Sequence, residues 1–215
     1  MNLQPLGDRA GGGTSVLPRA LGLPRDPVAA ATRFASRRTR RIALGRVDGR
    51  RFGFSAGLGV DAELVRAVDR LGRTVDGRRP GDRAFVRAAL GLLREKRFRV
   101  EPTVELVGIG RAAFVLAANC TPYTYLGRVG LRFAPAATFE GGIDVVAPER
   151  VGPGTLPLLG WWALGRGSAH VRAHDVTRVE VRCDVPTALQ VDGEDLGDVT
   201  EVVLESEPDA VTMLV

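Results

Sequence analysis

The sequence has few of the residues that support disulfide frameworks or metal sites. Its 215 residues include two cysteines, Cys120 and Cys183, and two histidines, His170 and His174. The cysteines lie far apart without a CxxC partner, and no acidic or cysteine ligand stands in register with the histidines. We therefore expect neither a disulfide framework nor a zinc site, and we expect the histidines to be structural or surface residues.

Long hydrophobic runs are also missing. The longest, such as Ala112–Ala118, have the length of a strand and fall well below the ~18 residues of a membrane-spanning helix. The first residues, Met1–Pro18, are polar and glycine-rich and lack the apolar centre of a signal peptide. We expect a cytoplasmic protein without a transmembrane segment.

Lysine is almost absent. Lys96 is the only one, so arginine carries nearly all of the positive charge behind the formal net charge of +5. A basic balance is typical of proteins that bind nucleic acid or an anionic membrane surface, and it also arises from a GC-rich coding sequence. Aromatic residues make up 6% of the chain, which is too few for a base-stacking surface. We expect no nucleic-acid partner.

The remaining composition is that of a globular domain, with 45% hydrophobic and 26% charged residues. Apolar residues at helical spacing predict helices over Ser15–Leu21, Pro27–Ser36, Asp61–Leu71, Arg83–Arg94 and Leu156–Leu164. Segments bounded by turn residues predict strands over Arg41–Val47, Arg51–Ala56, Arg99–Val107, Ala112–Asn119, Arg128–Phe133, Ile143–Ala147, Arg178–Cys183, Ala188–Val191, Val199–Leu204 and Ala210–Val215. The predicted fold class is α+β: a mostly antiparallel β-sandwich or open barrel with a helical insertion.

Acidic residues stand beside glycines in three places. Asp61 follows a glycine-rich turn at a predicted helix start, where it is either a functional carboxylate or the N-cap. Glu140 and Asp144 flank two glycines and could hold a hard divalent cation, although such residues also form ordinary turns. Asp192 and Glu194 follow an apolar strand; the pair could accept a proton from a hydroxyl group, or Asp-Gly simply forms a hairpin turn.

The N-terminal segment carries a glycine-rich turn. The run Gly11-Gly12-Gly13-Thr14-Ser15 precedes a predicted helix, and the backbone N–H groups of such a turn suit a phosphate. No lysine follows, so the run is not a Walker motif. The first ~40 residues contain loops and helices but no predicted sheet of their own, which favours a remnant of another lobe.

The motifs form a spaced series along nearly the whole chain. They are GGGTSVLPRALGLP at 11–24, GLGVDA at 57–62, Asn119, Pro135, EGGID at 140–144 and VDGE at 191–194. This series resembles the diacylglycerol kinase and sphingosine kinase family of soluble lipid kinases. The resemblance implies two parts: residues 1–40 as a remnant of the nucleotide-binding catalytic lobe, of α/β type, and residues 41–215 as the β-rich C-terminal domain.

The resemblance also implies a reaction and roles for particular residues. An ATP-dependent lipid kinase would phosphorylate a lipid hydroxyl, of a diacylglycerol-like or a sphingoid lipid. Gly12, Gly13 and Thr14 match the family's loop that approaches the ATP phosphates. Asp192 matches the acidic residue that acts as general base, and Glu194 matches the glutamate that supports it. Phosphoryl transfer depends mostly on positioning and charge neutralisation.

A metal ion and partners complete the expectation. Glu140 and Asp144 match an acidic motif that resembles the family's metal-associated one, with Glu140 where the family has aspartate, so Mg²⁺ is implied. The family's GGDG motif would lie upstream of Gly11, and Ser15 stands where the family has asparagine. The alternative is therefore a truncated, non-catalytic lipid-binding or regulatory module. The implied partner is a lipid at the membrane surface, where the protein would be peripheral; a homodimer is compatible with the sequence.

Overall fold

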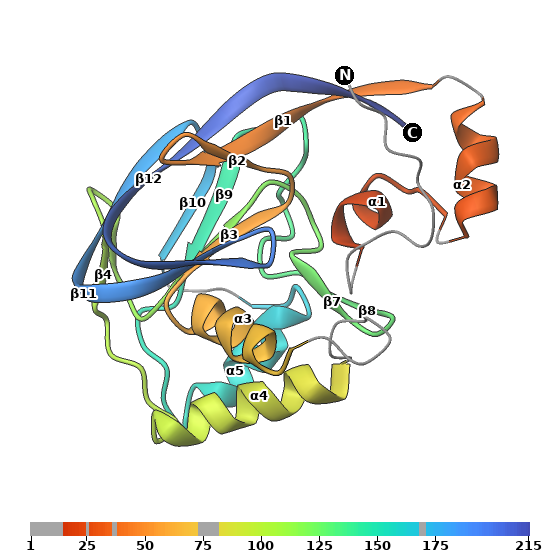
Figure 1. The fold of residues 1–215 in the computed structure, drawn as a ribbon. Coiled ribbons are helices and arrows are strands. Elements are labelled where there is room, and N and C mark those ends of the chain that lie inside the picture. Colours follow the sequence, from red (N-terminus) through yellow and green to blue (C-terminus); the bar gives the residue numbers. More distant parts are fainter. Residues whose placement is uncertain (1–14, 25, 36–37, 73–81, 168–170) are drawn as a thin grey trace.

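The fold is α+β and mostly antiparallel (Figure 1). The computed structural model describes residues 15–24, 26–35, 38–72, 82–167 and 171–215. Its strands are β1 (Thr39–Val47), β2 (Arg50–Phe52), β3 (Ser55–Leu58), β4 (Val104–Leu106), β5 (Gly110–Ala112), β6 (Val115–Ala118), β7 (Thr124–Leu126), β8 (Val129–Leu131), β9 (Ile143–Ala147), β10 (Val171–Val176), β11 (Arg178–Val191) and β12 (Glu194–Leu214). The predicted fold class is confirmed.

Ten strands belong to one open sheet. Its main path runs β10-β9-β6-β3-β11-β12-β1-β2, while β4 pairs with β11 and β5 with β4. Strands β7 and β8 form a separate two-stranded sheet. The β11–β12 hairpin is long and strongly curved, so that it wraps around the other strands (Figure 1). Strand β11 therefore pairs with β3, β4 and β12, and it joins the two halves of the sheet.

The structure differs from the sequence prediction in the length of these two strands. Cys183 and Leu204 were the predicted ends of separate strands, whereas β11 and β12 are continuous across Pro186 and Pro208. Both prolines lie where the strand register shifts, Pro186 in the β11–β12 pairing and Pro208 in the β1–β12 pairing. A bulge leaves its residue unpaired, so the missing N–H of proline costs no ladder hydrogen bond there.

Five helices lie in the described part of the chain: α1 (Val16–Ala20), α2 (Pro27–Phe34), α3 (Val60–Arg70), α4 (Asp82–Glu95) and α5 (Leu156–Ala163). Helix α2 begins as predicted, because the Asp26 carboxylate accepts a hydrogen bond from Ala29 N at 2.9 Å and Pro27 takes the first position. In α3 the N-cap is Gly59, so the alternative of Asp61 as N-cap is wrong. The Asp61 side chain is free to serve another part of the fold.

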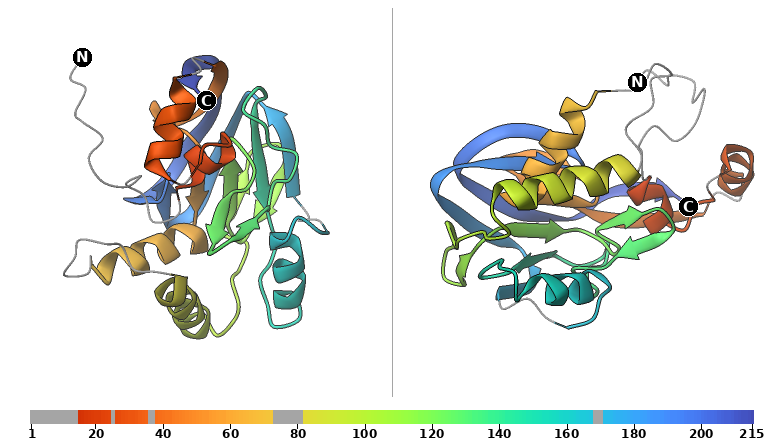
Figure 2. Two further views of the ribbon diagram at one scale, coloured as in Figure 1. Left: turned by 90° about the vertical axis from the view of Figure 1, so that its right-hand side faces the viewer. Right: turned by 90° about the horizontal axis from the view of Figure 1, so that it is seen from below.

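Three groups of buried apolar side chains fix the positions of these elements. The largest lies within the main sheet and includes Phe52, Leu58 and Leu204. A second lies beneath α5, and a third joins α1 to β1 through residues such as Leu21 and Ile42. Helices α3, α4 and α5 lie at one end of the molecule, and α1 and α2 lie to one side of the sheet (Figures 1 and 2).

Candidate functional site

The centre of the candidate site is the turn between β11 and β12. Asp192 and Gly193 both have positive φ, 49° and 79°, the backbone conformation of two-residue hairpin turns. Asp-Gly thus forms the hairpin turn that was one of the two interpretations of this motif. The turn also directs the Asp192 carboxylate toward the connection between β2 and β3.

The Asp192 carboxylate accepts three hydrogen bonds from the backbone. Oδ2 accepts from Gly53 N at 2.7 Å, and Oδ1 accepts from Phe54 N at 3.0 Å and Ser55 N at 3.1 Å. A carboxylate has about four acceptor positions, so one position remains on Oδ2. Uncharged N–H groups therefore orient this carboxylate and leave room for one further donor, such as a hydroxyl group.

The surroundings make Asp192 a stronger base than an exposed aspartate. Burial raises its pKa, the three backbone hydrogen bonds lower it in part, and the charge of Glu194 raises it further. The buried Cys120 thiol is another neighbour, and burial together with the Asp192 charge raises its pKa to about 12. The thiol is therefore neutral at physiological pH and is no nucleophile.

A buried polar network lies behind the turn. Asp61 Oδ2 accepts hydrogen bonds from Tyr123 Oη and Gln190 Nε2, each at 2.8 Å. Gln190 Nε2 lies 3.0 Å from Tyr123 Oη, and Gln190 Oε1 accepts from Gly193 N at 2.9 Å. Gln190 thus ties the hairpin turn to the first turn of α3.

Burial sets the charges within this network. Desolvation raises the pKa of Asp61, and the hydrogen bonds from Tyr123 and Gln190 lower it in part. The pKa of Tyr123 is raised well above its usual value by burial and by the Asp61 charge, so the phenol keeps its proton and donates it. Gly57 leaves the space for this arrangement, because a Cβ at position 57 would lie 2.0 Å from Asp61 Oδ2.

Asn119 also holds the β2–β3 connection, through hydrogen bonds to the carbonyl groups of that connection. Its Nδ2 donates to Ala43 O at 2.8 Å and Gly53 O at 3.1 Å, and its backbone N donates to Phe54 O. The side chain is fully buried, and its Oδ1 has no hydrogen-bond partner among the described residues. Asn119, which the motif series included, therefore fixes the backbone whose N–H groups hold Asp192.

The other predicted residues of the kinase motifs lie around this centre or outside the described part of the chain. Glu194 is exposed and forms an ion pair with Arg50 at 2.5 Å. Gly12, Gly13 and Thr14 lie outside the described residues. Leu17 in α1 packs beside Gly53, where a Cβ would lie 3.2 Å from Leu17 Cδ2 and 3.8 Å from Asp192 Oδ2.

The two acidic residues of the 140–144 segment have separate partners. Glu140 forms an ion pair with Arg40 at 2.6 Å. Asp144 is buried, lies 2.7 Å from His174 Nδ1 and accepts a hydrogen bond from Asp175 N. Within the described ranges, no three His, Cys, Asp or Glu side chains come together as a metal-binding group. The pair does not form a shared cage in this arrangement, and Mg²⁺ binding stays a prediction.

Sequence reasoning did not identify Tyr123 and Gln190. Gln190 does carry a local signal: it is a polar residue in an apolar run, two positions before Asp192 and so on the same face of the strand. Tyr123 carries none, because it reaches Asp61 only through the pairing of β3 with β6 and the loop that follows β6.

The fold is similar to several solved structures. A crystal structure of a diacylglycerol kinase from Bacillus anthracis str. Sterne matches with a TM-score of 0.62 and 15% identity, over 95% of this chain and 63% of that chain. Another structure from the same strain, provisionally assigned as a diacylglycerol kinase, gives a TM-score of 0.64 at 17% identity, over 95% of this chain and 65% of that one.

These matches establish a shared fold and a difference in length. This chain spans 63% to 65% of the length of those proteins. No protein-family model matches the sequence, and no curated protein matches it significantly. At 15–17% identity the likeness concerns the fold, and the reaction has to be argued from the site.

Proposed function

We propose that the chain is the β-rich, lipid-facing part of a lipid kinase that phosphorylates a lipid hydroxyl with ATP. Asp192 accepts the hydroxyl proton while the hydroxyl oxygen forms a bond to the γ-phosphorus and the bond from that phosphorus to ADP breaks. The observation that carries this proposal is the Asp192 carboxylate, half-buried, held by three backbone N–H groups and left with one open acceptor position.

Two further observations support the proposal. The similar structures are diacylglycerol kinases by their assignments, which favours a diacylglycerol-like over a sphingoid lipid. The described residues that follow the predicted phosphate loop also reach the site, because Leu17 packs beside Gly53 and near Asp192. Residues 1–40 as the remnant of a nucleotide-binding lobe, and residues 41–215 as the lipid-kinase domain, remain part of this proposal.

ATP supplies the phosphoryl group in this reaction, and Gly12, Gly13 and Thr14 would bind its phosphates. Mg²⁺ at Glu140 and Asp144 stays a prediction from the resemblance, since each carboxylate has its own protein partner. The chain's own described residues orient the base: Asn119 fixes the connection that holds Asp192, and Gln190 fixes the turn. Glu194 would support Asp192 by raising its pKa.

A non-catalytic lipid-binding or regulatory module is the second candidate. It is favoured by the fact that Asp192, Glu194, Glu140 and Asp144 all have protein partners that stabilise the fold. Such a module would bind lipid without any change on addition of ATP.

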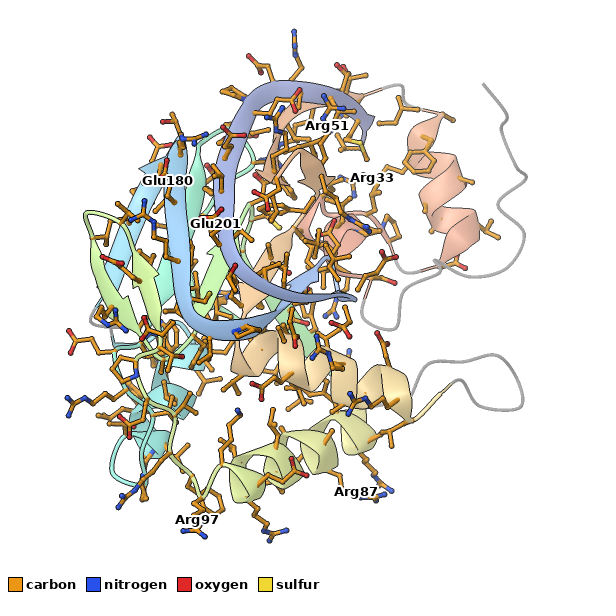
Figure 3. All side chains as sticks on the ribbon, turned by 60° about the vertical axis from the view of Figure 1, so that its left-hand side comes forward. Arg33, Arg51, Arg87, Arg97, Glu180 and Glu201 are labelled. Carbon is orange, nitrogen blue, oxygen red and sulfur yellow. The ribbon has the colours of Figure 1, made fainter. Side chains whose placement is uncertain are left out.

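The test compares Asp192→Asn with Glu201→Gln, an exposed carboxylate of β12 (Figure 3). Transfer of labelled phosphate from ATP to a diacylglycerol is measured together with lipid binding. We expect Asp192→Asn to lower kcat by about 10²- to 10⁴-fold, which is the usual contribution of a general base, with lipid binding retained. Glu201→Gln serves as the matched control and keeps the wild-type rate.

Two outcomes would contradict the proposal. Measured in a complete kinase that includes a nucleotide-binding lobe, wild-type turnover in Asp192→Asn would remove the base assignment. Lipid binding without any ATP-dependent transfer in that same context would favour the module. The pH profile of the wild-type rate gives an independent readout if the variant folds poorly. Its acidic limb reflects the raised pKa of Asp192 and should lie above the usual range of an aspartate.

A further inference from the structure

Helix α5 is apolar on both of its faces. Its sequence is LPLLGWWA, without a charged residue. The inner face packs on the protein: Trp162 is 2% exposed, its Nε1 donates to Phe133 O at 2.9 Å, and its ring meets that of Phe133 edge-on. A helix that is hydrophobic all round is normally buried on all sides, so its outer face needs an explanation.

The outer face of α5 is exposed. Leu158 is 65% exposed, Trp161 55% and Leu164, at the C-cap, 46%. These residues are three apart, so they lie along one side of the helix. Trp161 and Trp162 are neighbours in sequence with opposite environments, since one is exposed and the other is buried. We call Leu158, Trp161 and Leu164 the α5 outer face.

Two arginines border the α5 outer face. The Arg166 guanidinium lies 5.1 Å from the centre of the Trp161 ring. Arg132 N donates to Ala163 O at 2.7 Å, which places Arg132 at the C-terminal end of α5. Within the described ranges neither arginine forms an ion pair. The sequence has no Asp or Glu between Glu149 and Asp175.

Helix α4 lies at the same end of the molecule as α5 (Figures 1 and 2). An isolated bridge between Val100 and Val151 joins the segment after α4 to the segment before α5, and both helices face the viewer when the molecule is seen from below (Figure 2). Val86 and Leu90 on α4 are 41% and 45% exposed. Arg87 on α4 and Arg97 just beyond it project away from the protein at this end (Figure 3).

We propose that the α5 outer face docks onto the surface of an anionic lipid bilayer. Tryptophan beside leucines suits the boundary between headgroups and acyl chains, and the bordering arginines attract anionic headgroups. The absence of acidic residues from this stretch favours a lipid surface over a basic partner. No helix of the described residues is long and apolar enough to cross a membrane, so α5 would lie in the plane of the interface.

The experiment measures binding of the full chain to phosphatidylcholine vesicles with and without phosphatidylglycerol, by co-sedimentation and by tryptophan fluorescence. We expect binding to the anionic vesicles with a blue shift of the Trp161 emission. Trp161→Phe should remove this shift, because Trp162 is already buried. Leu158→Gln with Leu164→Gln should weaken binding at least ten-fold, about the effect of removing two buried apolar side chains from the interface.

The electrostatic part of the proposal is tested separately. Arg132→Gln and Arg166→Gln should each weaken binding to the anionic vesicles by about five-fold, and added salt should reduce that difference. Val28→Gln is the matched control for the two leucine substitutions, because Val28 on α2 is 73% exposed but lies away from α5 (Figure 1). It should bind vesicles like the wild type.

Three results would overturn the proposal. The first is that the Leu158→Gln, Leu164→Gln variant binds vesicles as tightly as the wild type does. The second is that the wild type does not bind anionic vesicles. The third is that the wild type dimerises without vesicles and that this variant abolishes the dimer. The last would make the α5 outer face an interface between two copies. The assay contains no ATP, so its result is independent of the proposed kinase activity.

Discussion

Two acidic segments that combine carboxylates with glycine differ in the partners of their aspartates, whereas the glutamate of each pairs with an arginine. In the 190–194 turn, uncharged backbone N–H groups hold Asp192, and Gln190 links the turn to the partly buried Asp61. In the 140–144 segment, Arg40 neutralises Glu140 and His174 faces Asp144. Both segments combine carboxylates with glycine, so the sequence alone does not distinguish them.

Burial sets the direction of the pKa shift for Asp192, and the partner sets it for Glu140. Burial raises the pKa of Asp192 above its usual value, and the N–H groups offset this only in part. The hydrogen bond from Arg40 lowers the pKa of Glu140. A carboxylate held by dipoles keeps its charge and part of its basicity, whereas one paired with a guanidinium is a weaker base. The comparison therefore favours the 190–194 turn as the place for proton transfer.

The largest expected effect concerns the network behind the turn. Gly57→Ala would place a Cβ 2.0 Å from Asp61 Oδ2 and 3.0 Å from Gln190 Nε2. Asp61 would have to move and lose its hydrogen bonds from Tyr123 and Gln190, which we expect to lower the free energy of unfolding by about 2–3 kcal/mol. Urea denaturation measures this change.

Gly91→Ala is the matched control for Gly57→Ala. Gly91 lies within α4, and a Cβ there would meet nothing within 4 Å. Alanine favours the helix, so we expect a gain of roughly 0.5–1 kcal/mol. Equal stability changes in the two variants would show that Gly57 does not serve the polar network.

A smaller effect is expected from Asp61→Asn, and it depends on pH. The folded pKa of Asp61 is raised, so the folded protein binds more protons than the unfolded chain between the two pKa values. The contribution of Asp61 to the free energy of unfolding should therefore fall as pH rises from about 4 through the folded pKa, by at most about 1.4 kcal/mol per pH unit. The difference between wild type and Asp61→Asn isolates this slope. A slope of the opposite sign would mean that the hydrogen bonds outweigh burial.

The smallest effect is expected from Glu140→Gln. The side chains of Arg40 and Glu140 are 38% and 54% exposed, so the pair should contribute only about 0.2–1 kcal/mol, and less in salt. Because the folded pKa of Glu140 is lowered, this contribution is present above the unfolded pKa and is lost as pH falls through the folded one.

The metal prediction is tested by thermal melts of the Glu140→Gln, Asp144→Asn double variant with and without Mg²⁺. A Mg²⁺ effect identical to that of the wild type would contradict it.

Local signals in the sequence predicted those parts of the structure that depend on neighbouring residues. The Asp26 cap with Pro27 marked the start of α2, and Asp192-Gly193 marked the hairpin turn. Neither depends on distant pairing, because a cap and a two-residue turn are formed by the residues themselves.

Features that depend on distant pairing could not be predicted in this way. The predicted strands end before Pro186 and Pro208, yet β11 and β12 continue across them, because each proline lies where the register with the partner strand shifts. Tyr123 contacts Asp61 only after the sheet has formed. The different partners of Glu140 and Asp144 likewise come from β1 and β10.

The pairing of β1 with β12 has a consequence for how the chain is made. Thr39 lies opposite Leu214, and Val47 opposite Leu204, so the first strand of the described residues pairs with the last strand described. At roughly 5–20 residues per second, β1 waits on the order of 10–30 s for its partner. During that time β1 can pair with the three residues of β2, and the backbone of Ala43 can bond to Phe139 O and Asn119 Nδ2. We expect this pair to form more slowly than the local β11–β12 hairpin, because its partners lie much farther apart in the sequence.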